Sequence, residues 1–590
     1  MNTRRQFLIQ APIGLLGAVA ACRNGSSAAD TAARTSATPG APPAFNTAPP
    51  VGPEVTPATF AEAEKLMQVG MTDAERTMMA GSWRTSMAAL LERRTGPRRI
   101  ALEPTLAPAT RWEPASIPNA GTGPATDRFV RTPVDPGALP ATDADIAFAP
   151  VTQLARWIET RKLTSERLTR IYLDRIDRFD PKLRCVITRV GDAAVARARA
   201  ADSEIAAGRY RGPLHGIPYG VKDLMDTKGI ATTYGAEPFK DRVPDADSAV
   251  VARLNATGAV LIAKLSMGAL ALNDIWFGGQ TMNPWLLEEG ASGSSAGPGA
   301  ATAAGLVGFS VGSETGGSII SPSMRCGVTG LRPTYGRVPR TGAMTLCWSL
   351  DKLGPMTRSV EDAMLVLHAI SGPDAGAAVK GLRVGYVQSW MQEAPATDVD
   401  RAALDSLGRL GLVPTPITLP DWPYDSLNLL LFAEAAAAFE ELTLSNRDDQ
   451  LKAQVPDAWP NLFREARFLS AVDFVQADRL RRKVAAEMAR VMSQVDLLLV
   501  PSLRDEMLVI SNNTGHPSLT LRTGFVNVSK ARSDWAPDPA HPLPTFNPPR
   551  RVPHGVTLIG RLFDEGTIGR VGLALERAAK VAGERPKGFE

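Results

Sequence analysis

Two serine-containing segments and one lysine have the residue types needed for nucleophilic chemistry at a carbonyl carbon. Residues 290–334 read GASGSSAGPGAATAAGLVGFSVGSETGGSIISPSMRCGVTGLRPT, and upstream residues 216–223 read GIPYGVKD. Glycine at this density lets backbone N–H groups crowd around a reacting atom. The serines could supply a nucleophile and its proton relay, and Lys222 could supply the base, since neither segment contains a histidine.

A serine hydroxyl attacks an amide or ester only when a base takes its proton and donors stabilise the oxyanion that forms. Lysine can be that base only in its neutral form, which requires burial or neighbouring positive charge. Lys222 stands among the apolar residues Ile217, Pro218, Val221 and Leu224, whereas the adjacent Asp223 would favour the charged form if it faced the amine. A lone lysine, taken without context, is more often a solvated surface residue.

Taken together, GIPYGVKD, GASGSSAGPGAATAAGLV and GSETGGSIISPSMRCGVTGLRPT closely resemble the amidase signature family. The resemblance implies a Ser-cisSer-Lys triad that uses no metal and no cofactor. By position, Ser318 corresponds to the nucleophile, Ser294 to the bridging serine on a cis peptide bond, and Lys222 to the lysine. The 24 positions that separate Ser294 from Ser318 fit the spacing of the family.

The resemblance also implies a mechanism. Neutral Lys222 would accept a proton from Ser294, which in turn takes one from Ser318 as the Ser318 oxygen attacks the carbonyl. The relay would then protonate the leaving amine, and water would hydrolyse the acyl-enzyme. Ser295 would support Lys222 or Ser294 by hydrogen bonding, although a plain turn serine is equally compatible. The oxyanion hole would consist of the backbone N–H groups of Thr315, Gly316, Gly317 and Ser318.

Further segments extend the resemblance over about residues 146–590, namely FGGQTMNPW at 277–285, NTGHPS at 513–518 and GVTLIG at 555–560. The chain departs from the family at Ala296, which replaces a common glycine, and at Ile320 and Ser321, where many relatives carry an arginine. The missing arginine indicates a less cationic pocket and argues against a small anionic substrate. Candidate pocket walls, for which core packing is an equally good explanation, are Trp276, Trp285, Met344 and Trp348.

Apolar periodicity predicts helices that alternate with strands from residue 146 onward. We expect helices at 151–161, 165–179, 192–207, 248–258, 360–371, 401–410, 424–445 and 474–494. We expect strands at 183–190, 259–264, 306–311, 382–386 and 496–500, with a short apolar segment at 215–223. Such alternation is typical of an α/β fold with a sheet covered on both faces. The resemblance implies the large mixed β-sheet of the amidase signature fold.

Three segments precede the predicted amidase domain at 146–590. Residues 1–22 indicate an export signal, because their apolar run at 7–21 is too short to span a bilayer. Within them, TRRQFL resembles a twin-arginine signal and VAAC resembles a lipobox. Residues 23–58, rich in Ala, Thr, Ser, Gly and Pro, predict a disordered tether, and 59–145 a helical and irregular extension. We expect a periplasmic or cell-surface protein whose membrane contact is a lipidated Cys22. Ordinary cleavage after Ala-x-Ala, with Cys22 incidental, is the alternative.

Composition narrows the possible partners. The 590 residues are 44% hydrophobic and 21% charged, which excludes a disordered chain, and the net charge of +4 comes without a basic stripe that would indicate a nucleic-acid partner.

Cys185, Cys326 and Cys347 lack zinc-site spacing, and we expect buried free thiols rather than a Cys326–Cys347 disulfide. The expected substrate is a small-molecule or peptide amide, with peptide, aryl and fatty amides and esters all open, as is the oligomeric state.

Three other functions are compatible with parts of the sequence. GSSAG at 293–297 fits the G-x-S-x-G elbow of α/β-hydrolases, with Ser295 as nucleophile. However, 285–290 is polar and turn-like rather than a strand, and no supporting motif surrounds His368, His516, His541 or His554. An amidotransferase A-subunit-like protein shares the signature, but export would remove it from tRNA. A non-catalytic envelope protein would not need to keep Lys222, Ser294 and Ser318 together.

Overall fold

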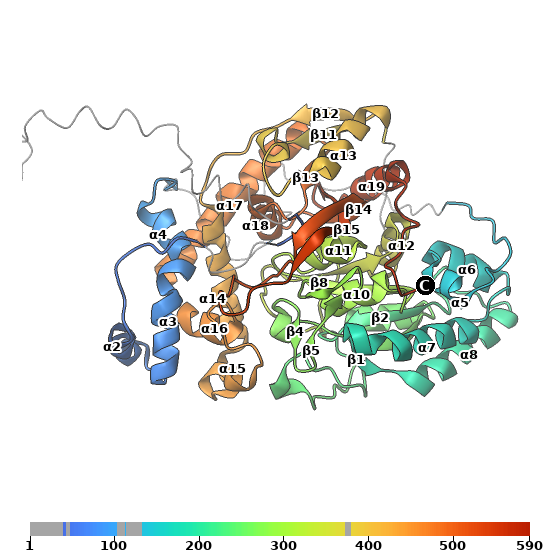
Figure 1. Cartoon of the computed structure of the whole chain (residues 1–590), viewed down its shortest axis with the longest axis horizontal. Coiled ribbons are helices and arrows are strands. Elements are labelled where there is room, and N and C mark those ends of the chain that lie inside the picture. Colours follow the sequence, from blue (N-terminus) through green and yellow to red (C-terminus); the bar gives the residue numbers. More distant parts are fainter. Residues whose placement is uncertain (1–38, 43–47, 103–112, 114–131, 372–378) are drawn as a thin grey trace, which may run out of the picture.

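The computed structural model describes residues 39–42, 48–102, 113, 132–371 and 379–590. Eleven strands form one mixed sheet (Figure 1). In spatial order these are β1 (Val186–Arg189), β3 (Val260–Leu265), β2 (Pro218–Lys222), β8 (Phe309–Glu314), β10 (Lys352–Thr357), β9 (Thr329–Arg332), β14 (Ser518–Lys530), β15 (Thr545–Gly560), β13 (Leu497–Pro501), β11 (Arg383–Tyr386) and β12 (Val413–Pro416). The predicted α/β class and mixed sheet are confirmed.

The central strands are buried on both faces because helices cover them. Every residue of β2, β8, β9 and β10 is buried. Strand β14 contacts both α11 (Ile320–Cys326) and α19 (Glu565–Ala579), while β10 contacts α10 (Ala296–Ala303) and α12 (Val360–Ser371). Near β1 and β3 lie α7 (Ser165–Leu183) and α8 (Gly191–Ala206) (Figure 1). The continuous apolar runs of the central strands are the pattern expected of doubly covered sheet.

Two of the expected elements are wrong. The single helix expected at 424–445 is divided into η5 (Tyr424–Leu427), α14 (Asn428–Ala438) and α15 (Glu440–Leu444). The break falls at Phe439, which leaves helical geometry and stacks on Phe463 with ring centroids 5.6 Å apart. The segment expected to be turn-like, 285–290, contains β7 (Leu286–Gly290), which pairs with β6 (Met282–Asn283) in a separate two-stranded sheet.

In the part of the N-terminal extension before residue 103, three helices lie against the C-terminal half of the chain. These are α2 (Pro57–Met67), α3 (Asp73–Ser86) and α4 (Ala88–Thr95), with Thr56 and Thr72 as capping residues of α2 and α3. Helix α3 lies beside α16 (Trp459–Ala466), α4 lies beside α17 (Ala471–Gln494), and α2 packs against α3 (Figure 1). Because α4 carries Arg93 and Arg94, both of which pair with Asp473 of α17, the extension is attached by charge as well as by packing.

Several sequence predictions fall on residues that the structure does not describe. The export signal at 1–22, most of the tether at 23–58 and part of the extension at 59–145 lie outside the described residues. Within the described part of the chain, no helix combines the length and apolar composition that a membrane span requires. The three cysteines beyond Cys22 are free and buried, as predicted.

A buried carboxyl joins the extension to the main α/β body of the chain. Glu465 of α16 is fully buried, and its carboxyl oxygen lies 2.6 Å from Ser82 Oγ of α3 and 3.3 Å from Asn461 Nδ2. Burial raises the pKa of Glu465 from 4.5 to about 7, against the opposing effect of these hydrogen bonds. Ser82 Oγ donates to the Glu465 carboxyl oxygen and itself accepts from Asn461 Nδ2 at 3.0 Å, which connects α3 to α16.

We therefore predict that stability falls as pH rises. Because the folded-state pKa of Glu465 is above that of the unfolded chain, its contribution is complete below pH 4.5 and is lost as pH rises through about 7. The loss in the free energy of unfolding is at most about 3 kcal/mol. Urea denaturation between pH 5 and 8 should show this slope, and Glu465→Gln should flatten it. An unchanged slope in that variant would contradict the prediction.

Candidate active site

Lys222, the last residue of β2, is buried in the centre of the sheet with its amine surrounded by three serine hydroxyls. Its Nζ lies 2.7 Å from Ser294 Oγ, 3.1 Å from Ser295 Oγ and 2.8 Å from Ser313 Oγ. The lysine is fully buried, and the three serines are between 0% and 6% exposed. The structure thus brings the predicted Lys222, Ser294 and Ser295 into direct contact and adds Ser313, which sequence reasoning missed.

Asp223 does not face the amine of Lys222. Successive side chains along a strand point to opposite sides, so the residue after Lys222 is directed away from it. The Asp223 carboxylate instead pairs with Lys264 at 3.2 Å and accepts hydrogen bonds from the backbone and the hydroxyl of Thr233 at 2.8 and 2.5 Å. The carboxylate that could have kept Lys222 charged is therefore engaged elsewhere.

Burial determines the protonation state of Lys222. Burial lowers its pKa well below 10.5, while the negative charges of Asp351 and Glu314 act in the opposite direction. Neither carboxylate lies within ion-pair distance of the amine: Asp351 accepts hydrogen bonds from Thr315 Oγ1 and the backbone N–H groups of Leu346 and Cys347. Burial at this position therefore favours the neutral form of Lys222, which is the form that base chemistry requires.

The segment that carries Ser294 and Ser295 links β7 to α10. The peptide bond between Gly293 and Ser294 is cis, as the resemblance implies. Ser295 Oγ donates to the carbonyl oxygen of Ser313 at 3.0 Å and accepts from the Ser313 backbone N–H at 3.1 Å. Ser295 is therefore more than a turn residue, because it joins this segment to β8 as well as to Lys222.

Ser318 lies on the loop between β8 and α11, and its carbonyl oxygen accepts a hydrogen bond from the Ser295 N–H at 3.2 Å. Ser318 is half-buried and its neighbour Gly316 is exposed, so substrate can reach this loop. Gly317 has a φ of +139°, a conformation that favours glycine. In the described structure, the backbone N–H groups of Gly316, Gly317 and Ser318 donate to no other residue, which leaves them available to an oxyanion.

Sequence reasoning also missed Glu314, the last residue of β8. Its side chain holds the loop that carries Ser318. Its carboxylate accepts the N–H groups of Ile319 and Ile320 at 2.8 and 2.9 Å and pairs with Arg332 at 2.7 Å. Burial raises the pKa of Glu314, but Arg332 and the backbone donors outweigh it, so the pKa lies below 4.5. A sequence signal existed, because Ser313 and Glu314 directly precede the TGGS turn in the segment that carries the resemblance.

The residues that follow Ser318 are in apolar surroundings, where the resemblance leads one to expect an arginine. Ile320 is buried in a cluster with Met324, Leu503 and Leu508. A pocket beside it is lined largely by aliphatic side chains, among them Ile320, Leu503, Met507 and Leu508. Ser321 is also buried, and its N–H donates to the carbonyl of Gly317 at 2.8 Å.

The four candidate pocket walls lie in different surroundings. Trp276 and Trp285 donate their indole N–H groups to the carbonyls of Arg184 and Cys326, and Met344 is buried. Trp348 is 51% exposed on the loop that also carries Asp351, so it is the member of this set with a free indole face. Trp276 and Trp285 thus fit the packing explanation, and Trp348 remains a candidate for substrate contact.

The histidines give no support to a hydrolase elbow at Ser295. A strand and a helix do flank Ser295, but its hydroxyl contacts Lys222 and Ser313. Three of the four histidines have other partners: His516 contacts Thr514, His541 contacts Asp538, and His554 contacts Asp400. In the described ranges, no group of three or more His, Cys, Asp and Glu side chains has the arrangement of a metal site.

Comparison with known proteins identifies the family. The family model described as Amidase matches residues 167–568. The chain belongs to the amidase family. It is therefore an enzyme of that family, and its signature is that of a hydrolase. Its fold is the amidase signature fold, as expected.

Individual relatives cover most of both chains. The AmiD protein of Mycobacterium tuberculosis, an amidase by provisional name, is 36% identical over 482 residues, or 77% of this chain and 99% of that protein. The A-type subunit of the glutamyl-tRNA(Gln) amidotransferase from Anaeromyxobacter dehalogenans is 32% identical over 466 residues. The match covers 71% of this chain and 94% of that protein. The structure of the peptide amidase from Stenotrophomonas maltophilia aligns with a TM-score of 0.62 and 29% identity, covering 75% of this chain and 99% of that one.

We predict that Ser313→Ala lowers kcat/KM for amide hydrolysis by about five- to tenfold, because it removes one of three hydrogen-bond partners of the Lys222 amine. Ser310→Ala is a matched control on the same strand, since Ser310 Oγ contacts Thr302 and the carbonyl of Pro298 rather than Lys222. Steady-state kinetics should show full activity in the control. Equal losses in both variants would contradict a specific role for Ser313.

Proposed function

We propose that this amidase-family hydrolase cleaves carboxylic amides through an acyl-enzyme on Ser318, with Ser294 as relay and Lys222 as base. The observation that carries the proposal is the buried Lys222 amine, 2.7 Å from Ser294 Oγ and without a carboxylate partner among the described residues. The half-buried Ser318 supplies an oxygen that substrate can reach. The four N–H groups at 315–318 are the proposed oxyanion hole, and Ser295 a supporting residue.

The hydrogen-bond partners of Lys222 give the relay a direction. A neutral amine has two N–H donors and one lone pair. The Ser295 hydroxyl already donates to the carbonyl of Ser313, so Ser295 can only accept from Lys222. With Ser313 as the second acceptor, the lone pair is left for the hydroxyl proton of Ser294.

The proposed reaction then follows with its protons balanced. Ser318 Oγ attacks the amide carbon as its proton passes to Ser294, and the Ser294 proton passes to Lys222. The tetrahedral oxyanion accepts N–H donors from the loop, and collapse breaks the C–N bond while the relay returns a proton to the leaving amine. Water adds to the Ser318 ester through the same relay, which releases the acid and restores the enzyme.

The proposed substrates are amides without a negative charge near the scissile bond. Ile320 and its aliphatic neighbours offer no cation, and Arg504, which also lines this pocket, is already paired with Glu393 and Glu506. Burying a further, unpaired carboxylate there would be costly. A solved structure of a related peptide amidase is described as a complex with the competitive inhibitor chymostatin. Peptide amides are therefore the first class to test, ahead of aryl and fatty amides and esters.

A second candidate, an amidotransferase A-subunit-like protein, is favoured by the similarity to the A-type subunits of glutamyl-tRNA(Gln) amidotransferases. The predicted export signal opposes it, because tRNA is not available outside the cytoplasm. Cytoplasmic recovery of the protein with a second, different chain bound to it would support this candidate. A non-catalytic envelope protein would be supported instead if a fluorophosphonate failed to label Ser318.

We predict that Ser318→Ala reduces amide hydrolysis by at least about a thousandfold, since the residue that forms the acyl-enzyme is lost. A library of amides and esters, assayed with protein that lacks residues 1–22, should identify the substrate class and measure this loss. Fluorophosphonate labelling of the parent protein should map to Ser318 by mass spectrometry. Residual activity near the parent level in Ser318→Ala would refute the mechanism, and Ser310→Ala serves as the folded control.

We further propose that the enzyme is exported and anchored outside the cytoplasmic membrane by a lipid on Cys22. This proposal rests on the TRRQFL and VAAC segments and on the composition of residues 23–58. We predict that the full chain incorporates radiolabelled palmitate and sediments with membranes, whereas Cys22→Ala does neither. If the parent protein is unlabelled and is recovered in soluble form, Cys22 is not lipidated, and either ordinary signal cleavage or no export has occurred. In that case Cys22→Ala and the parent protein should give the same result.

A further inference from the structure

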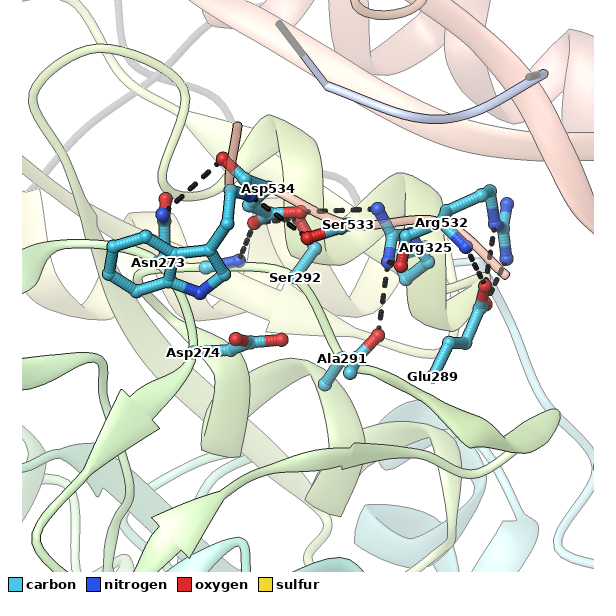
Figure 2. A network of polar contacts seen from close by, with 12 residues as sticks. Asn273, Asp274, Glu289, Ala291, Ser292, Arg325, Arg532, Ser533 and Asp534 are labelled. Carbon is cyan, nitrogen blue, oxygen red and sulfur yellow. Dashed lines mark hydrogen bonds and ion pairs between the residues drawn. The ribbon is translucent and has the colours of Figure 1, made fainter. Parts of the chain in front are cut away.

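Asp534 lies far from the catalytic serines in the sequence but contacts the two residues that directly precede Ser294. Its Oδ2 accepts a hydrogen bond from Ser292 Oγ at 2.7 Å and from the Gly293 backbone N–H at 2.8 Å. Asp534 belongs to the segment that joins β14 to β15, and it is 7% exposed. Figure 2 shows its carboxylate directed at the Ser292 segment.

The same carboxylate also reaches the helix that follows the nucleophile. Arg325, near the end of α11, donates from Nη2 to Asp534 Oδ1 at 3.1 Å. Its Nη1 donates to the carbonyl of Gly290 at 3.1 Å and to that of Arg532 at 3.2 Å (Figure 2). One buried cluster therefore connects the backbone before Ser294, the helix after Ser318 and the segment that carries Asp534.

The position of Asp534 is itself fixed by neighbouring contacts. Arg532 forms a buried pair with Glu289 of β7 at 2.5 Å, and the Arg532 backbone N–H donates to the same carboxylate at 2.9 Å. Asn273 Nδ2 donates to the carbonyl of Asp534 at 3.3 Å (Figure 2). These contacts hold the backbone on both sides of Asp534, so its carboxylate is a fixed acceptor rather than a mobile one.

The backbone at Ser292 and Gly293 needs a fixed hydrogen-bond acceptor to keep its conformation. Ser292 has a φ of +64°, which L residues other than asparagine and aspartate seldom adopt unless surrounding contacts enforce it. Gly293 has no room for a side chain, because a Cβ there would lie 1.7 Å from the carbonyl oxygen of Asn273. Hydrogen bonds to the side chain of one residue and the N–H of the next are suited to keeping this conformation.

The charges around Asp534 are balanced. Arg325 and Arg532 contribute positive charge, and Glu289 and Asp534 contribute negative charge, with Asp274 buried beside them. Burial raises the pKa of Asp274 to about 7, and the negative charge of Asp534 acts in the same direction. Burial also raises the pKa of Asp534, but Arg325, the Ser292 hydroxyl and the Gly293 N–H act in the opposite direction. The 3.1 Å contact with Arg325 favours the charged form of Asp534.

We propose that Asp534 is a positioning residue for catalysis, which holds Ser292 and Gly293 so that the next residue, Ser294, meets the Lys222 amine. The inference rests on the proposed role of Ser294 as relay. Asp534 does not touch the reacting atoms, and its contribution is the geometry of the contact between Ser294 Oγ and Lys222 Nζ. Its loss should therefore slow proton transfer during acylation without changing the surfaces that bind substrate.

Asp534→Asn tests this role. The asparagine side chain has the same shape, but its single oxygen cannot accept the hydrogen bonds of Ser292, Gly293 and Arg325 together. We expect kcat to fall about 10- to 100-fold with KM within about twofold of the parent value. Fluorophosphonate labelling of Ser318 should slow by a similar factor, although this probe needs no amide-binding contacts. Normal kcat in a folded Asp534→Asn protein would overturn the proposal.

Asp362→Asn is the matched control. Asp362 is also buried, 1% exposed, and accepts two successive backbone N–H groups, from Val151 and Thr152, at 2.9 and 3.0 Å. We expect this control to lose thermal stability with kcat unchanged. If both variants lose activity only in proportion to the protein that remains folded, Asp534 is structural and the proposal is wrong.

Asp534→Asn leaves Arg325 without its charged partner and could prevent folding. Ser292→Ala then provides a second test, because it removes one donor and leaves the Asp534–Arg325 pair intact. We expect a decrease in kcat of about three- to tenfold with unchanged KM, and an unaltered kcat would overturn the proposal. Ser318→Ala separates this inference from the proposed function, since activity in that variant would refute the function whatever the effect at Asp534.

Discussion

The burial of one amine without an acid to pair with it is the constraint on which the rest of the site depends. A lysine in water is charged and cannot take a proton, so the fold must make charging unfavourable. It does so by placing Lys222 at the end of a central strand covered on both faces. The same strand geometry turns Asp223 away to Lys264, and Asp351 is occupied by Thr315 and backbone donors. What remains around the amine is three hydroxyls, which can solvate it without charging it.

The two segments that bring serines to this amine are held in the same way. Glu314 accepts two successive backbone N–H groups after Ser318 and pairs with Arg332. Asp534 accepts a hydroxyl and a backbone N–H before Ser294 and pairs with Arg325. In each case a buried arginine offsets the electrostatic cost of the carboxylate, and the carboxylate fixes a glycine-containing turn that has few contacts of its own. Rigid turns around a half-buried Ser318 suit the nucleophilic role proposed for it, since such catalysis needs pre-organised groups.

Sequence reasoning was accurate where periodicity or local motifs carry the signal. Helices α7, α8 and α12 and strands β3, β11 and β13 lie where apolar patterns predicted them, and Lys222, Ser294 and Ser295 do meet. The long hairpin of β14 and β15 was not predicted, because prolines and arginines interrupt its second strand. Ser313 and Glu314 were overlooked since their importance depends on strand β8 lying beside β2. Asp534 has no local signal at all.

The dependence on Asp534 changes how similarity within this family bears on function. The segments that carry the resemblance contain the proposed reacting groups, whereas the Asp534 carboxylate, more than two hundred positions away, contacts the two residues before Ser294. The connection that carries Asp534 joins β14 to β15, and these strands pair with β9 and β13 in the sheet. The geometry of Ser294 is therefore completed only when the C-terminal part of the sheet is in place. A chain could keep all three signature segments and still lack a working relay if this connection differed, so the catalytic site is a property of the whole sheet rather than of its motifs.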